Sequence, residues 1–318
     1  MSRAIASLAV TALLTFLIAC GSGVASSGNN GGNSGGNSGG SSGGGAAVRH
    51  VVVVVLENQS YSDVIGSSSM PYFNQLANQY SLATQFYADV HPSIGNYFMM
   101  TAGQNPSQNN DAYSGTVSGA NVASALTSAG KAWKVYAQSL PSAGYTGGDQ
   151  YPYLKHHDPF AYFDSVLGSS GQSTDIVPFS QFAADMNSGS LPNYAFIVPD
   201  AEHDGHDCPD GTQNCADSER LAEADNFLQS TLSPLFSNSS LIANTVVIVT
   251  YDEAAVSDTT NGGGHIAVVI AGGPVKTGYQ SASMYQFPSL LRFSLESLGV
   301  SSYPGAASSA ADMDEFLK

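Results

Sequence analysis

The sequence has few basic residues. Only nine of its 318 residues are Lys or Arg, against 25 Asp and Glu, and the formal net charge is −16. Proteins that bind nucleic acid neutralise backbone phosphates with clustered cations, and the chain has no basic stripe. We therefore expect no nucleic-acid partner. An anionic substrate would have to be held by a metal ion, by histidines or by backbone N–H groups, because arginine is scarce.

The N-terminus lacks an apolar run long enough to span a membrane comfortably. Arg3 precedes an apolar segment over residues 4–17, which is shorter than the ~20 residues of a spanning helix. This pattern is typical of an export signal. The segment ends in Leu17-Ile18-Ala19-Cys20, which resembles a bacterial lipobox; the alternative is an ordinary signal peptide in which Cys20 has no role.

We therefore predict a lipoprotein signal peptide over residues 1–20, with a lipid on Cys20 as the anchor to a membrane. Residues 21–46 are mostly Gly, Ser and Asn and are expected to form a flexible linker. Residues 47–318 then form a single domain. The expected location is the bacterial cell envelope, on the periplasmic or cell-surface side of a membrane.

Cysteine is rare as well. Apart from Cys20, the chain contains only Cys208 and Cys215, in a loop that includes Pro-Asp-Gly. In an exported protein, two cysteines this close on a turn predict a disulfide. Their spacing is too wide for the CxxC pair of a zinc site.

Two apolar runs have neither a helical nor an alternating period. His50–Asn58 reads His-Val-Val-Val-Val-Val-Leu-Glu-Asn, and residues 245–250 read Thr-Val-Val-Ile-Val-Thr. Such short β-branched runs are typical of strands buried on both faces of a parallel sheet. Segments with helical patterns separate the strand-like segments. The sequence therefore predicts an α/β fold, a three-layer sandwich around a central and largely parallel sheet.

Each of these two runs is followed by a pair of residues with side-chain oxygens. Glu57 and Asn58 follow the first, and Asp252 and Glu253 follow the second. Ligands bind outside the carboxyl ends of strands in open parallel sheets, and oxygen ligands suit a hard divalent cation. We therefore predict a site for a divalent metal ion at these four side chains. The alternative is that each pair only ends a strand and faces solvent.

Ser93 is the candidate nucleophile. It precedes an apolar segment with a helical pattern, where its hydroxyl could lie among free N–H groups that attract an anion. Capping the helix is the commoner role for such a serine, so both alternatives stay open. A metal ion bound to the serine oxygen would lower its pKa and make it a nucleophile without a histidine base.

Histidines supply the remaining candidates. Five of the seven lie in polar loops, and imidazoles can bind a phosphoryl oxygen or protonate a leaving group. The adjacent pair leaves open which of its two rings faces a site. The five are His156, His157, His203, His206 and His265.

Five short motifs together resemble a phosphoesterase family that includes bacterial and fungal acid phosphatases and phospholipases C, within the alkaline phosphatase-like superfamily. They occur in order across about residues 51–276, nearly the whole predicted domain. The motifs are Glu57-Asn58 with Ser60-Tyr61, His91-Pro92-Ser93 with Asn96-Tyr97, Lys155-His156-His157-Asp158-Pro159-Phe160, Asp204-Gly205-His206-Asp207, and Tyr251-Asp252-Glu253 with Gly264-His265.

The resemblance implies an alkaline phosphatase-like fold and a role for each motif. Ser93 would attack phosphorus and form a phosphoserine that water then hydrolyses. Four side chains would hold one metal ion together with the Ser93 oxygen: Glu57, Asn58, Asp252 and Glu253. Three other side chains would bind or protonate the phosphoryl group: Asn96, His157 and His206. Two further histidines are candidates for phosphate binding: His203 and His265.

The sequence therefore predicts a metal-dependent hydrolase of phosphate esters, and most specifically an acid phosphatase that acts on phosphomonoesters. A phosphodiesterase resembling phospholipase C is the alternative enzyme. A surface lipoprotein that binds a ligand without catalysis is the alternative outside enzymes. The enzyme hypothesis requires that Ser93 and the four metal-ligand candidates converge at one edge of one sheet.

Overall fold

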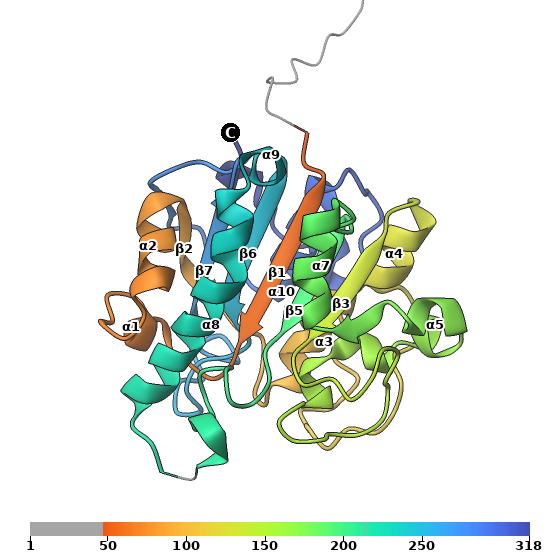
Figure 1. Ribbon diagram of the computed structural model, residues 1–318, viewed down its shortest axis with the longest axis horizontal. Coiled ribbons are helices and arrows are strands. Elements are labelled where there is room, and N and C mark those ends of the chain that lie inside the picture. The colour runs from red at the N-terminus through yellow and green to blue at the C-terminus, as the bar shows by residue number, and fades with distance from the viewer. Residues whose placement is uncertain (1–46, 213) are drawn as a thin grey trace, which may run out of the picture. The chain divides into compact units, whose positions relative to one another are not determined.

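An eight-stranded sheet lies at the centre of the computed structural model, which describes residues 47–212 and 214–318 (Figure 1). The strand order is β4-β3-β5-β1-β6-β7-β2-β8. All neighbouring strands are parallel except that β7 is antiparallel to β6 and β2. The strands are β1 His50–Leu56, β2 Ser81–Tyr87, β3 Trp133–Ala137, β4 Ile176–Pro178, β5 Tyr194–Val198, β6 Thr245–Tyr251, β7 His265–Gly272 and β8 Tyr279–Ser281.

Helices cover both faces of this sheet and complete the three layers (Figure 1). Helices α2, α7 and α8 lie on the face toward the viewer, and α3 and α10 pack together behind the sheet. The α-helices are α1 Tyr61–Val64, α2 Pro71–Gln79, α3 Ile94–Ala102, α4 Val122–Ser128, α5 Asp164–Leu167, α6 Ser170–Ser173, α7 Ser180–Ser188, α8 Asp217–Ser237, α9 Ser239–Ile242 and α10 Phe287–Ser297. Short 3₁₀ helices are η1 Lys155–His157, η2 Pro159–Tyr162, η3 Pro209–Gly211, η4 Gly305–Ser308 and η5 Asp314–Phe316.

The two unbroken apolar runs form neighbouring strands in the middle of the sheet. Residues 51–56 of β1 and all of β6 are buried, as expected for strands that are covered on both faces. β1 pairs with β6 in parallel over its whole length, and Leu56 lies opposite Tyr251. The predicted α/β fold with a largely parallel sheet is confirmed.

One helix runs further than its sequence suggests. The pattern of residues 218–230 predicts one helix and a second helical stretch up to about residue 241, whereas α8 is continuous over Asp217–Ser237 and contains Pro234. A proline removes one backbone hydrogen bond from a helix. Leu228, Leu232 and Leu235 are buried on the same helix, and this packing keeps it continuous.

The structure contains the predicted disulfide between Cys208 and Cys215. Cys20, the signal segment 1–20 and the linker 21–46 lie outside the described residues. Among the residues that are described, no helix is long and apolar enough to cross a membrane.

Candidate active site

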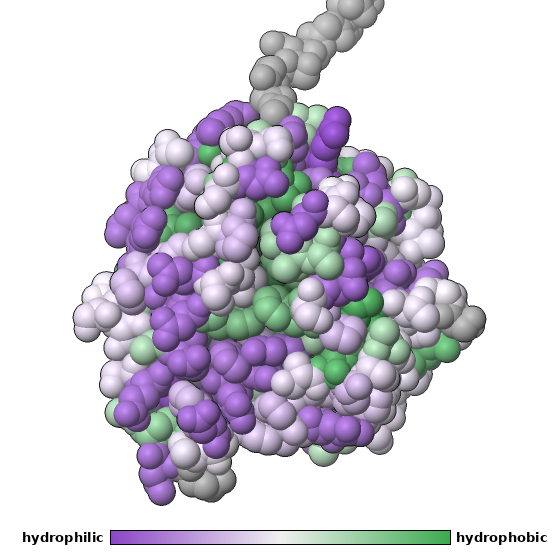
Figure 2. Space-filling model, in the orientation of Figure 1, coloured by the Kyte–Doolittle hydropathy of each residue, from purple (hydrophilic) through white to green (hydrophobic). Residues whose placement is uncertain are grey.

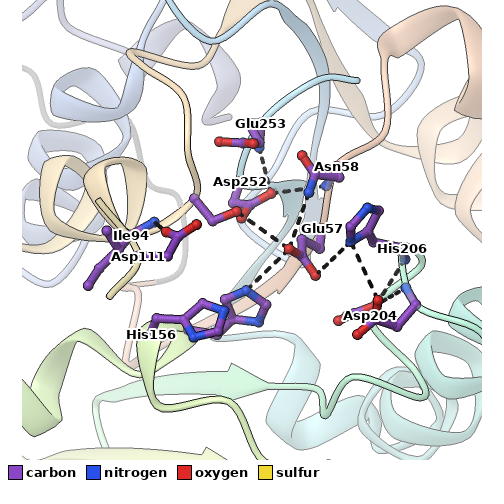
Figure 3. A network of polar contacts seen from close by, with 12 residues as sticks. Glu57, Asn58, Ile94, Asp111, His156, Asp204, His206, Asp252 and Glu253 are labelled. Carbon is purple, nitrogen blue, oxygen red and sulfur yellow. Dashed lines mark hydrogen bonds and ion pairs between the residues drawn. The ribbon is translucent and has the colours of Figure 1, made fainter. Parts of the chain in front are cut away.

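The parallel register of β1 and β6 places the ends of the two strands side by side. Glu57 and Asp252 each follow the last paired residue of their strand, and both are buried, at 6% and 0% exposure. The N–H groups of Asn58 and Glu253 donate to Asp252 Oδ1 at 3.1 and 2.7 Å. These two bonds hold the Asp252 carboxylate at the end of its strand, and the neighbouring Glu57 carboxylate accepts Asn58 Nδ2 at 3.2 Å (Figure 3).

Ser93 lies at the start of α3 and faces this carboxylate pair. Its side chain is buried, and its hydroxyl lies 3.5 Å from Glu57 Oε1. The hydroxyl makes no capping hydrogen bond to α3, although Ser93 occupies the N-cap position. The sequence leaves open whether Ser93 is a nucleophile or a helix cap. In the structure its hydroxyl is directed at the Glu57 carboxylate and not at the helix.

The N–H groups at the start of α3 are not free, contrary to the expectation from the sequence. Ile94 donates to Asp111 Oδ1 at 3.0 Å, and Gly95 and Asn96 donate to carbonyl oxygens of the preceding turn. The Asp111 carboxylate reaches this position from a loop without regular structure. Sequence reasoning missed it, because nothing in that loop indicates where its chain passes.

His157, and not His156, is the histidine of the adjacent pair that faces the site. Its ring is 1% exposed, and Nε2 lies 3.5 Å from Glu57 Oε1. The Tyr97 ring stacks on it with centroids 5.1 Å apart. The His156 ring instead lies against Asp149, with 3.2 Å between Nδ1 and Oδ2. Packing against Tyr97 therefore selects the ring that reaches the carboxylates.

His206 approaches the same carboxylate from the loop after β5. Its Nδ1 lies 3.5 Å from Glu57 Oε2, and its side chain is 45% exposed. The Asp204 carboxylate accepts the backbone N–H groups of His206 and Asp207 at 2.9 and 3.2 Å, which fixes this turn (Figure 3). His206 is thus the partly exposed histidine of the cluster.

The cluster fits a metal ion. Glu57, His157 and Asp252 present ligand atoms within 4.8 Å of one another. Buried polar atoms are nearly always hydrogen-bonded in folded proteins, yet five in this cluster have no hydrogen-bond partner among the described residues. They are Glu57 Oε2, Asn58 Oδ1, His157 Nε2, Asp204 Oδ2 and Asp252 Oδ2.

The ionisation of these groups reflects the same concentration of buried negative charge. Burial and the neighbouring Glu57 raise the pKa of Asp252 to about 7. Burial, Asp252 and Glu57 raise the pKa of Glu253 to about 10. Burial opposes the charge on His157, but Glu57 raises its pKa to about 9. A divalent cation would allow these carboxylates to ionise together, because it is the largest local charge in such a site.

Glu253 and Asn96 pair with each other rather than with the three-residue cluster. Asn96 Nδ2 donates to Glu253 Oε2 at 3.2 Å, and Glu253 Oε1 lies 3.0 Å from His91 Nδ1. Asn96 Oδ1 also accepts the N–H groups of Asp89 and Val90. These contacts tie the turn before Ser93 to the residue after Asp252. His91 had no role assigned from the sequence.

Two predicted phosphate-binding histidines lie apart from Ser93. His203 Nδ1 lies 2.6 Å from Asp200 Oδ1. The His265 ring stacks between Tyr61 and Tyr87, with centroid distances of 4.4 and 4.9 Å. The structure therefore gives both histidines contacts within the protein and does not bring them to the cluster around Glu57.

Comparison with known proteins shows the family of this chain. A sequence profile of the Phosphoesterase family matches residues 67–293. The chain belongs to this family. The hydrolase of phosphate esters predicted from the sequence is thereby confirmed at the level of the family.

Similar curated proteins carry names of phosphatases. A phosphatidylinositol-3-phosphatase of Mycobacterium tuberculosis is 33% identical over 72% of this chain and 70% of its own length. An acid phosphatase of Aspergillus fumigatus is 29% identical over 73% of this chain and 50% of its own. The chain thus spans about half the length of this fungal relative.

Solved structures share the fold at low sequence identity. A protein of the alkaline phosphatase superfamily from Vibrio parahaemolyticus aligns over 85% of this chain and 72% of its own, with a TM-score of 0.56 and 16% identity. The PsFucS1 sulfatase of Pseudoalteromonas aligns over 85% of this chain and 74% of its own, with a TM-score of 0.54 and 13% identity. The alkaline phosphatase-like fold is therefore shown.

Proposed function

We propose that this chain hydrolyses phosphate monoesters, with Ser93 as the nucleophile and a divalent metal ion bound at the ends of β1 and β6. The observation that carries the proposal is the buried Ser93 hydroxyl directed at Glu57, in a site where Glu57 Oε2 and Asp252 Oδ2 have no hydrogen-bond partner among the described residues. The names of the similar curated proteins support the choice of a phosphatase.

Glu57, Asn58 and Asp252 would hold the ion with the Ser93 oxygen, because each has a buried oxygen without a hydrogen-bond partner. When bound, the ion would lower the pKa of the serine hydroxyl and stabilise negative charge in the transition state. Of the five side chains that the sequence predicts to converge, Glu253 has the least direct access, since it contacts His91 and Asn96.

The side chains of Ser93, His206 and His157 carry out the bond-forming, proton-transfer and orienting steps of the reaction. Once the Ser93 hydroxyl has lost its proton to solvent, its oxygen forms a bond to phosphorus as the bond to the leaving alcohol breaks. His206, at the exposed side of the cluster, is placed to give a proton to that alcohol. Water then attacks the phosphoserine, which releases inorganic phosphate and restores the Ser93 hydroxyl. His157, buried against Tyr97, orients the phosphoryl group.

Hydrolysis of p-nitrophenyl phosphate by the purified full chain tests this proposal. We expect turnover by the wild type and a phosphorylated Ser93 peptide after acid quenching, found by mass spectrometry. Turnover of p-nitrophenylphosphorylcholine in preference to the monoester would show a phosphodiesterase instead. A Ser93→Ala variant with full activity would rule out the nucleophile.

We also propose that the chain is a lipoprotein of the bacterial cell envelope, as residues 1–46 suggest. Residues 47–49 lead into β1 at its amino end, whereas the candidate active site follows its carboxyl end (Figure 1). Detergent-phase partition of the full chain, and its loss in a Cys20→Ala variant, tests the anchor. Partition that is equal for both chains would exclude it.

A further inference from the structure

A cavity of about 670 Å³ extends from the candidate active site to the start of α8. Its volume is in the range of small-molecule pockets. Asn58, His206 and Glu253 of the site line it, and so does Pro92, the residue before Ser93. The lining beyond the site includes Gln59, Asp63, Asp217, Arg220, Leu221 and Val256.

Among the described residues that line this cavity, Arg220 is the one Lys or Arg. Its Nη1 donates to Asp217 Oδ1 at 3.0 Å, and its Nε donates to Cys215 Sγ at 3.2 Å. Sulfur is a weak acceptor, and the Asp217 side chain is 80% exposed, so this ion pair contributes little. Within residues 47–212 and 214–318, the guanidinium group therefore has no strong buried acceptor.

The disulfide packs against this guanidinium group. Cys208 and Cys215 are joined directly before α8, and Arg220 contacts the sulfur atoms of both, with its Nη2 3.9 Å from Cys208 Sγ. The Arg220 side chain is only 25% exposed. A cation that is fixed before the ligand arrives loses less conformational freedom on binding.

We propose that this cavity receives the leaving alcohol of the substrate and that Arg220 binds a second anionic group on that alcohol. The inference rests on the proposed phosphomonoesterase function. Pro92, Leu221 and Val256 would contact the carbon skeleton between the two anions. The substrate anion would replace Asp217 as the acceptor for the guanidinium, whose planar fork suits a carboxylate or a phosphate.

The surface around the cavity favours a polar alcohol. The part of the molecule at the start of α8 is mainly hydrophilic (Figure 2). Three carboxylates, those of Asp63, Asp217 and Glu253, line the cavity and would favour a cationic alcohol. Glu253 contacts His91 and Asn96. Asp217 already pairs with Arg220, and Asp63 is exposed to solvent. An anion is therefore the better match, and an amine becomes an outcome of the test.

The test uses three series of alkyl monophosphates, whose far end carries a carboxylate, a hydroxyl or an amine, over several chain lengths. We expect the wild type to prefer the carboxylate over the hydroxyl at one or more lengths. In Arg220→Gln, the ratio of kcat/KM between these two series should fall about tenfold or more, because a charge-assisted hydrogen bond is lost. Asp217→Asn should raise the ratio, since it removes the competing acceptor.

Arg292→Gln is the matched control, because Arg292 also pairs with a carboxylate, that of Glu296, but does not line the cavity. It should leave the ratio unchanged. A preference for the amine, or no preference that depends on Arg220 at any length, would overturn the subsite alone. Failure of the wild type to hydrolyse p-nitrophenyl phosphate would overturn the proposed function together with the subsite.

Discussion

Asp185 on α7 and Asp252 after β6 are both buried carboxylates, at 3% and 0% exposure, but their surroundings differ. Lys134 Nζ, Tyr136 Oη and Gln181 Nε2 donate to Asp185 at 2.6, 2.7 and 2.9 Å. Although burial opposes the charge, these donors lower the pKa of Asp185. Asp252 lies beside Glu57, and its Oδ2 has no hydrogen-bond partner among the described residues.

The difference separates a carboxylate that stabilises the fold from one that needs a ligand. Asp185 has a cation and two further donors within the chain, so its interactions are complete in the protein alone. Asp252 faces a second carboxylate, and burial raises its pKa to about 7 with the help of Glu57. A buried charge without a partner is costly. We infer that the Asp252 cluster is built for function at the expense of stability.

Removing the nucleophile should have the largest effect. In Ser93→Ala, we expect kcat for p-nitrophenyl phosphate to fall at least about a thousandfold, as for other nucleophiles that act with a supporting group. The thermal midpoint should stay close to that of the wild type, because the hydroxyl makes only a long contact of 3.5 Å with Glu57. A low midpoint would show instead that the hydroxyl is structural.

The second-largest effect is expected for Asp252→Asn, which changes the carboxylate that we assign to the metal site. Activity should fall about a hundredfold or more, since even neighbours of metal ligands matter at the level of ten- to a hundredfold. In chelator, however, its free energy of unfolding should be higher than that of the wild type, because one of two adjacent buried carboxylates is replaced by a neutral amide. Urea denaturation with and without chelator measures this. If Asp252→Asn were less stable than the wild type in chelator, the Asp252 carboxylate would stabilise the fold as Asp185 does, and the proposed difference between the two would be wrong.

Metal removal should destabilise the wild type. A ligand at a hundred times its dissociation constant stabilises a protein by about 2.7 kcal/mol, so chelation should lower the thermal midpoint clearly. The same treatment should change the midpoint of Asp252→Asn much less. Equal changes in the two proteins would place the ion at another site.

Asp185→Asn tests the carboxylate that stabilises the fold. We expect the free energy of unfolding to fall by about 1–3 kcal/mol, because Lys134 and Tyr136 lose a charged acceptor. Hydrolysis of p-nitrophenyl phosphate should stay close to the wild-type rate under conditions where the variant is folded. A loss of activity comparable to that of Asp252→Asn would show that Asp185 also serves the active site and does not only stabilise the fold.

The smallest effect concerns pH. The folded-state pKa of Asp185 is lowered, so its contribution is complete above its unfolded pKa of about 3.9. The contribution is lost as the pH falls through the lower folded-state value. In chelator, the stability difference between the wild type and Asp185→Asn should therefore be constant above about pH 5 and shrink below about pH 4. A difference that grows on acidification would contradict the role of Asp185 as an ionised acceptor.

The sequence predicts the centre of the fold because β1 and β6 are unbroken apolar runs. Their parallel register then places Glu57 beside Asp252, which explains why these two site residues could be found without a structure. The three-residue edge strands β4 and β8 carry too little pattern to be predicted.

The residues missed at the site reach it by tertiary packing. Asp111 and His91 contact the start of α3 and Glu253 from loops, and a loop sequence does not specify its path. The choice of His157 over His156 depends on stacking with Tyr97. His265 follows a glycine-rich segment that reads as a loop, but it begins β7 and stacks on Tyr61 and Tyr87, a contact between segments far apart in the chain.

The proposed mechanism depends most on whether the carboxylates at the ends of β1 and β6 hold an ion that Ser93 needs. The direct test is a titration of metal-free full chain with divalent ions, in which binding and hydrolysis of p-nitrophenyl phosphate are followed in the same sample. We predict that about one ion binds per chain, that hydrolysis rises with it, and that Asp252→Asn loses both. Full hydrolysis by the metal-free chain, or unchanged binding by Asp252→Asn, would contradict the account.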